Sequence, residues 1–173
     1  PDPGQPFGVP SERYQDRLQA DVTGRRIAWL GDWGGAYPME AGVLDGAAIG
    51  AARLEDAGCI VEDVAPPFDA SALWQSWITL RSWAVAAKLS PLYAQPELRA
   101  QLKPEAIWEI ERGLALTGAE IQRASAIRSD WYRAVTRMFA EYDAFVLPTA
   151  QCFPFPVAWD WPKVIGGVMM DTY

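Results

Sequence analysis

The sequence contains no histidine and only two cysteines among its 173 residues. Without histidine, the chain alone cannot assemble Ser-His-Asp or Cys-His catalysis, so any hydrolytic chemistry needs another base or a base from elsewhere. Cys59 and Cys152 lie far apart and show no metal-ligand spacing, which argues against a structural zinc site made within the chain. We therefore expect no metal and no cofactor, and two reduced, buried cysteines.

Two further absences bear on location and partners. No apolar run approaches the roughly 20 residues that span a bilayer, and the first residues lack the basic and apolar regions of a signal peptide. The expected location is therefore the cytoplasm. With 15 basic and 22 acidic residues the net charge is −7, and an acidic surface repels phosphate groups. We expect neither nucleic acid nor an anionic membrane as a partner.

The first part of the chain predicts a βαβ unit over residues 25–65. An apolar strand over Arg26–Leu30 precedes a helical pattern over Met39–Ala57, and a second strand follows over Cys59–Val64. Short connections of this kind place the two strands parallel in an α/β sheet. Three glycines repeat every four residues in the helix, which we interpret as close packing of helix on sheet: Gly42, Gly46 and Gly50.

Helical patterns fill residues 69–142. Asp69 is a predicted N-cap for a helix that runs to about Ala94 and is broken by Pro91 and Pro96. A second helix over Pro104–Leu116 has an expected inward face of Ile107, Trp108, Ile110 and Leu114. The stretch Thr117-Gly-Ala-Glu120 is a capping box and starts a third helix with one long apolar stripe.

Residues 143–173 combine a strand with a stiff aromatic loop. The stretch "EYDAFVLPTAQCFPFP" predicts a buried strand over Ala144–Leu147, which ends in Pro-Thr beside a proline-broken loop. Such a strand and loop are typical of the floor and wall of a pocket. No glycine-rich turn in the sequence places a serine beside it.

The order of four segments resembles the second half of an amidase signature hydrolase. They are "PDPGQPF", "YQDRLQADVTGRRIAWLGDWG", "AAIGAARLEDAGCIVEDVAPP" and "YDAFVLPTA". Each motif alone is weak, but the four in order cover nearly the whole chain. The resemblance implies that residues 1–173 are a single segment of an α/β amidase signature domain. Its parallel or mixed sheet, flanked by helices, would be part of the larger three-layer fold.

The resemblance also implies a reaction. Members of the family hydrolyse a carboxylic amide to an acid plus ammonia or amine with a Ser-cis-Ser-Lys triad, in which lysine replaces histidine as the base. The sequence has no Gly-Gly-Ser-Ser-Gly-like segment, so no catalytic residue is assigned to it. We expect the chain to supply pocket walls, with a small-molecule amide as substrate and the remaining part of the same polypeptide as partner.

Five residues are candidates for this pocket. Thr149, Cys152 and Phe153 follow the predicted strand and are expected to bind substrate, as is Trp77 on the long helix. The alternatives are that the Thr149 hydroxyl caps its own turn and that the aromatic side chains pack in the core. Asp2 matches a Gly-x-Asp-like turn that would lie beside the catalytic segment, or else it is a frayed terminal residue.

Two other functions stay open at this point. The chain is alternatively a non-catalytic binding or scaffold module with an amidase-like half fold. A lesser alternative is an amidotransferase A subunit, which shares the fold. The tryptophans of the last loop, Trp159 and Trp161, either cover another part of the protein or form an interface, which leaves a homodimer open.

Overall fold

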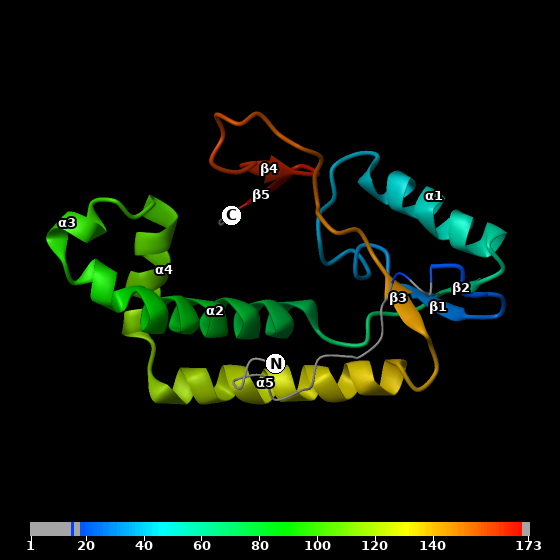
Figure 1. The fold of residues 1–173 in the computed structure, drawn as a ribbon, viewed down its shortest axis with the longest axis horizontal. Helices are drawn as coiled ribbons and strands as arrows, with labels where there is room; N and C mark the ends of the chain where they lie inside the picture. Colours follow the sequence, from blue (N-terminus) through cyan, green and yellow to red (C-terminus); the bar gives the residue numbers. More distant parts are fainter. Residues whose placement is uncertain (1–14, 16–17, 171–173) are drawn as a thin grey trace.

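The computed structural model describes residue 15 and residues 18–170, and they form an α/β fold (Figure 1). Its three-stranded sheet is parallel, in the order β2-β1-β3. The strands are β1 (Arg26–Trp29), β2 (Ile60–Asp63) and β3 (Ala144–Val146). A two-stranded antiparallel hairpin follows, made of β4 (Val164–Ile165) and β5 (Val168–Met169). The parallel sheet and the strand positions confirm the predicted fold class.

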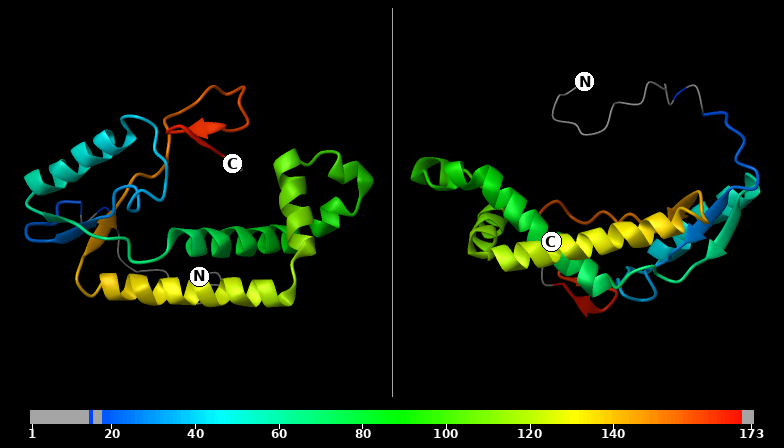
Figure 2. Two further views of the ribbon diagram at one scale, coloured as in Figure 1. Left: turned by 180° about the vertical axis from the view of Figure 1, so that it is seen from behind. Right: turned by 90° about the horizontal axis from the view of Figure 1, so that it is seen from below.

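Helices cover both faces of the sheet. The helix α1 (Val43–Asp56) lies on one side, and α5 (Gly118–Met138) ends on the other, as two views agree (Figures 1 and 2). Because side chains alternate along a strand, Ala28 and Leu30 of the β1 segment share one face. There they form a buried cluster with Trp33 and Met138. The core therefore joins the central strand to the end of α5.

The remaining helices form an arm that extends from the sheet (Figure 2). The helix α2 (Ala70–Tyr93) packs against α5 and against α4 (Pro104–Ala115), with the short α3 (Pro96–Arg99) between α2 and α4 in the chain. The predicted caps are confirmed: the Asp69 side chain accepts a hydrogen bond from the Ala72 N–H, and Thr117 and Glu120 complete a capping box. No helix within the described ranges is both long and apolar enough to cross a membrane.

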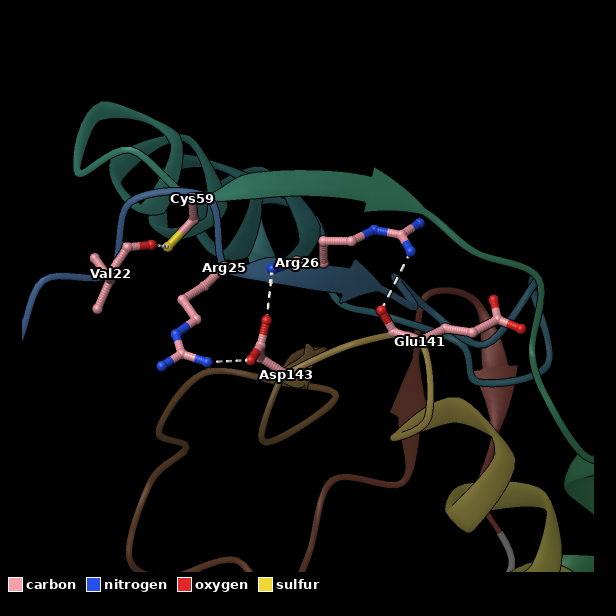
Figure 3. Close-up of polar contacts among 6 residues, drawn as sticks. All are labelled: Val22, Arg25, Arg26, Cys59, Glu141 and Asp143. Carbon is pink, nitrogen blue, oxygen red and sulfur yellow. Dashed lines mark hydrogen bonds and ion pairs between the residues drawn. The ribbon is translucent and has the colours of Figure 1, made fainter.

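A polar cluster joins the amino ends of β1 and β3 (Figure 3). The Asp143 carboxylate accepts hydrogen bonds from the Arg25 guanidinium at 2.6 Å and from the Arg26 N–H at 2.9 Å. Both bonds favour the ionised carboxylate and lower the pKa of Asp143, and the bond from the Arg26 N–H has the larger effect. At the neighbouring edge the Cys59 thiol donates to the Val22 carbonyl. These contacts set the register of β3 beside β1.

The structure corrects four expectations. The helix expected from Met39 begins at Val43, because Gly42 has a left-handed φ of 89°. The glycine repeat does not pack on the sheet: a Cβ on Gly46 or Gly50 would meet no atom within 4 Å. Pro91 does not break the long helix but lies in its last turn. The inward face of α4 is Glu109, Ile110 and Gly113, whereas Trp108 and Leu114 are exposed.

Candidate functional site

The carboxyl ends of β1 and β3 lie at the same edge of the sheet, because the strands are parallel neighbours. In α/β proteins this edge is where ligands usually bind. Two long loops leave it, one over residues 30–42 and one over residues 147–163. The Leu30 N–H still donates to the Val146 carbonyl at 3.0 Å, so the two loops start side by side.

Three hydrogen bonds join these two loops. The Glu40 N–H donates to the Gln151 carbonyl at 2.8 Å, and the Gln151 amide donates to the Pro38 carbonyl at 2.9 Å. The Phe153 N–H donates to the Glu40 carboxylate at 2.9 Å. These residues are about 113 positions apart in the sequence. The loop after β3 is therefore bound to the loop after β1.

The β4–β5 hairpin packs on the same loop. Its turn contains Gly166 and Gly167, which both have positive φ, as a tight two-residue hairpin turn requires. A Cβ on Gly166 would lie 2.7 Å from the Met39 carbonyl oxygen. Only glycine allows this approach, so the hairpin turn packs directly against the loop after β1.

An aromatic cluster lies beneath the first loop. The Trp33 side chain is buried, and its indole N–H donates to the Phe68 carbonyl at 3.0 Å. Its backbone has a left-handed φ of 63°. Its ring lies 5.7 Å from that of Trp131 and 6.3 Å from that of Tyr37. Burial raises the pKa of the Tyr37 hydroxyl, and the Asp69 charge adds to this effect. The cluster fixes the direction in which the loop leaves β1.

The structure brings three of the five predicted site residues into one loop. Thr149 is exposed just after β3, Cys152 is half-buried, and Phe153 is 50% exposed. The Phe153 ring lies beside Gly42, where an added Cβ would be 3.6 Å from the ring. These positions are compatible with a pocket wall, and substrate contact by these residues stays a prediction.

Trp77 lies on α2 and not in this loop. It is 46% exposed, and its ring stacks on that of Trp74 at 5.0 Å with Arg81 over it at 5.1 Å, so these contacts are within its own helix. Asp2 lies outside the described residues.

Sequence reasoning missed the polar residues that shape the edge. Glu40 and Gln151 join the loops. Glu40 lies in no quoted segment, and Gln151 lies in the stretch over residues 141–156 without any local signal of this role. Trp33 lies in the loop after the predicted strand over Arg26–Leu30, and the structure buries its side chain. Its position directly after an apolar strand, between glycines, is the signal that a buried anchor was present.

The serines and lysines of the described chain do not form a nucleophile–base pair. All six described serines lie on α2 or α5, and none is in a glycine-rich turn. Ser76 donates to the Ala124 carbonyl at 2.7 Å and Ser82 to the Glu109 carboxylate at 2.6 Å. The Lys163 ammonium lies over the Trp161 ring. Within the same ranges no group of three potential metal ligands is present.

Two of the comparisons with known proteins find partial similarity to amidase signature enzymes. No family model matches the chain. It is 26% identical over 174 residues to an acylamidase from Rhodococcus erythropolis, with 98% of this chain and 35% of the relative covered. A bacterial aryl acylamidase of the amidase signature family matches 91% of the chain with a TM-score of 0.78, 20% identity and 34% of its own length covered.

A further match is 6-aminohexanoate cyclic dimer hydrolase, with TM-scores of 0.60 alone and 0.59 with substrate. Both matches are at 20% identity and cover 81% of this chain and 30% of that one. The chain thus spans about a third of the length of the relatives it matches. It is similar to part of the amidase signature enzymes, and its α/β fold matches part of theirs.

Proposed function

We propose that this chain is part of an amidase signature hydrolase that converts a carboxylic amide to an acid plus ammonia or amine. The observation that supports the proposal most is the overlap of 91% of the chain with an aryl acylamidase at a TM-score of 0.78. The chain also has a parallel sheet whose carboxyl edge bears two hydrogen-bonded loops. The chain's role in the proposal is to form walls of the substrate pocket.

The attacking serine, the bridging serine and the lysine base lie elsewhere in this proposal. A desolvated lysine loses part of its preference for the charged form, so it can accept a proton near neutral pH. The serine it activates attacks the amide carbonyl, and backbone N–H groups stabilise the resulting oxyanion. The loop that contains Thr149, Cys152 and Phe153 orients the substrate through contact with its apolar part.

Exposed apolar surface supports the remaining polypeptide as a partner. Large apolar side chains of the last loop and hairpin are exposed, namely Phe153, Phe155, Val157, Trp159, Val164, Val168 and Met169. Apolar patches of this kind mark surfaces that another chain segment covers.

The test is amide hydrolysis by the protein from its full reading frame, with the 173-residue chain assayed in parallel. The panel contains an aliphatic primary amide, an aromatic primary amide, an anilide and a cyclic amide, with ammonia or amine release as the readout. Activity in the longer protein alone agrees with the proposal. Activity in the 173-residue chain contradicts the placement of the triad, and no activity in either contradicts the enzyme assignment.

A non-catalytic binding module is the second candidate. The six described serines all lie on helices, and Ser76 and Ser82 are hydrogen-bonded to other groups, which also fits a module without catalytic residues. A module predicts that the 173-residue chain is monomeric or a defined oligomer and unfolds cooperatively. A chain that forms pocket walls of a larger enzyme predicts aggregation through the exposed apolar surface. Analytical ultracentrifugation and urea denaturation distinguish the two.

A further inference from the structure

A cavity of about 320 Å³ lies where α2, α4 and α5 meet. Polar and apolar side chains of all three helices surround it. Its lining does not include Thr149, Cys152, Phe153 or Trp77. The cavity, which we call the three-helix cavity, is lined mainly by Gln75, Thr79, Arg112, Leu116, Arg123 and Ile127. Its volume is at the lower end of the range for pockets that bind small organic molecules.

The three-helix cavity is positively charged in an acidic protein. Arg112 and Arg123 line it together with a single carboxylate, that of Glu120, whereas the whole chain has a net charge of −7. Glu120 is already committed, because its carboxylate accepts hydrogen bonds from the Thr117 N–H and hydroxyl at 2.8 and 2.7 Å. Those bonds lower the pKa of Glu120. Two guanidinium groups against one ionised carboxylate leave one positive charge.

Arg112 lines the cavity, and its guanidinium lies over the Trp108 ring at 5.4 Å, which restricts its orientation. Its Nε is buried and has no partner within the described part of the chain. The two terminal NH₂ groups are therefore the donors that remain for an oxyanion in the cavity. The planar guanidinium geometry matches a carboxylate with two parallel hydrogen bonds.

Part of the lining is apolar. Leu116, Ala124 and Ile127 contribute hydrocarbon surface to the cavity. A fully polar anion such as inorganic phosphate would leave that surface unused, whereas a carboxylate with an apolar part would cover it. The lining therefore favours an amphipathic organic acid over a simple mineral anion.

We propose that the three-helix cavity binds a small organic carboxylate. Its carboxylate lies between Arg112 and Arg123, with the Gln75 and Thr79 side chains as further polar neighbours, and its apolar part contacts Leu116 and Ile127. Binding at this site involves no reaction and does not depend on amide hydrolysis. Either proposal can therefore fail without the other.

The test is isothermal titration calorimetry with benzoate as the probe and the protein from its full reading frame. Arg123→Met removes one charge at nearly constant length, and Arg112→Lys keeps the charge but removes the planar guanidinium that can bind a carboxylate with two parallel hydrogen bonds. Arg128→Met is the matched control, because Arg128 is exposed on the same helix and does not line the cavity. Circular dichroism checks that each variant is folded.

We expect saturable benzoate binding that Arg123→Met weakens about tenfold or more, because charged hydrogen bonds contribute on that scale. Arg112→Lys should weaken it several-fold, and Arg128→Met less than about twofold. Absence of saturable binding at millimolar benzoate, or equal weakening by Arg128→Met, overturns the site. Equal binding of benzyl alcohol overturns the role of charge, and equal competition by inorganic phosphate overturns the role of the apolar lining.

Discussion

The contact of α4 with α2 at Gly113 permits a quantitative prediction. A Cβ at this position would lie 2.1 Å from the Ser82 carbonyl oxygen and 2.6 Å from the Ala86 Cβ. Atoms in normal contact are about 3.5 Å apart, so Gly113→Ala must separate the two helices by about 1 Å or more. The nearest atom belongs to the backbone, and no side-chain rotation can relieve the clash.

The magnitude follows from what the separation disturbs. Overpacking of a core contact costs about 1–3 kcal/mol. The same movement lengthens the 2.6 Å hydrogen bond from the Ser82 hydroxyl to the Glu109 carboxylate. Glu109 is only 3% exposed, and a buried polar group with a poor hydrogen bond costs about 1–3 kcal/mol. Alanine regains about 1 kcal/mol of helix propensity. Gly113→Ala should therefore lower the free energy of unfolding by about 3 kcal/mol, a large share of the ~5–15 kcal/mol typical of a protein.

Urea denaturation followed by circular dichroism measures this loss. Gly50→Ala is the matched control, because it is also a helical glycine and its added Cβ would meet no atom within 4 Å. It should raise the free energy of unfolding by about 0.5–1 kcal/mol. If Gly113→Ala is as stable as the unmodified protein while Gly50→Ala behaves as expected, the close approach of α4 to α2 is wrong.

Three further predictions concern single side chains. Asp143→Asn should lower the urea midpoint at neutral pH. Because the folded-state pKa of Asp143 is lowered, its contribution to the free energy of unfolding is complete above about pH 4 and is lost as the pH falls further. The urea midpoints of the variant and the unmodified protein should therefore converge in acid. Thr117→Ala should cost about 1 kcal/mol by removing the N-cap of α5, whereas Thr136→Ala at an exposed position in the last turn of that helix should change the free energy of unfolding by less than about 0.5 kcal/mol. Cys152→Ala should raise KM for the amide substrate of the active protein a few-fold, and unchanged kcat and KM would remove Cys152 from the site.

Local signals in the sequence were sufficient for most of the fold. Apolar runs predicted both ends of each of the three parallel strands to within one residue. The caps Asp69 and Thr117 were predicted correctly because a cap depends only on the first turn of its own helix. The resemblance added the family and the α/β class. These features depend on residues close together in the chain, which a sequence displays directly.

Packing faces were harder to predict. The periodicity of α4 allowed an inward face with Trp108 and Leu114, but the helix turns Glu109, Ile110 and Gly113 inward instead. A glutamate becomes buried here because Ser82 and Arg81 supply its hydrogen bonds from another helix. Glycine lies at the closest contact because any side chain would meet the Ser82 carbonyl. Neither reason is visible without the neighbouring helix.

The candidate site depends still more on contacts between distant residues. Thr149 and Cys152 were predicted from a strand that ends in Pro-Thr, which is a local signal. The position of their loop is set by Glu40, whose backbone and carboxylate bind Gln151 and Phe153 across about 113 residues. The same bonds explain why α1 starts late: residues 38–40 bind the second loop, and Gly42 turns the chain before the helix. One set of long-range hydrogen bonds thus accompanies the late start of α1 and fixes the loop that contains Thr149 and Cys152.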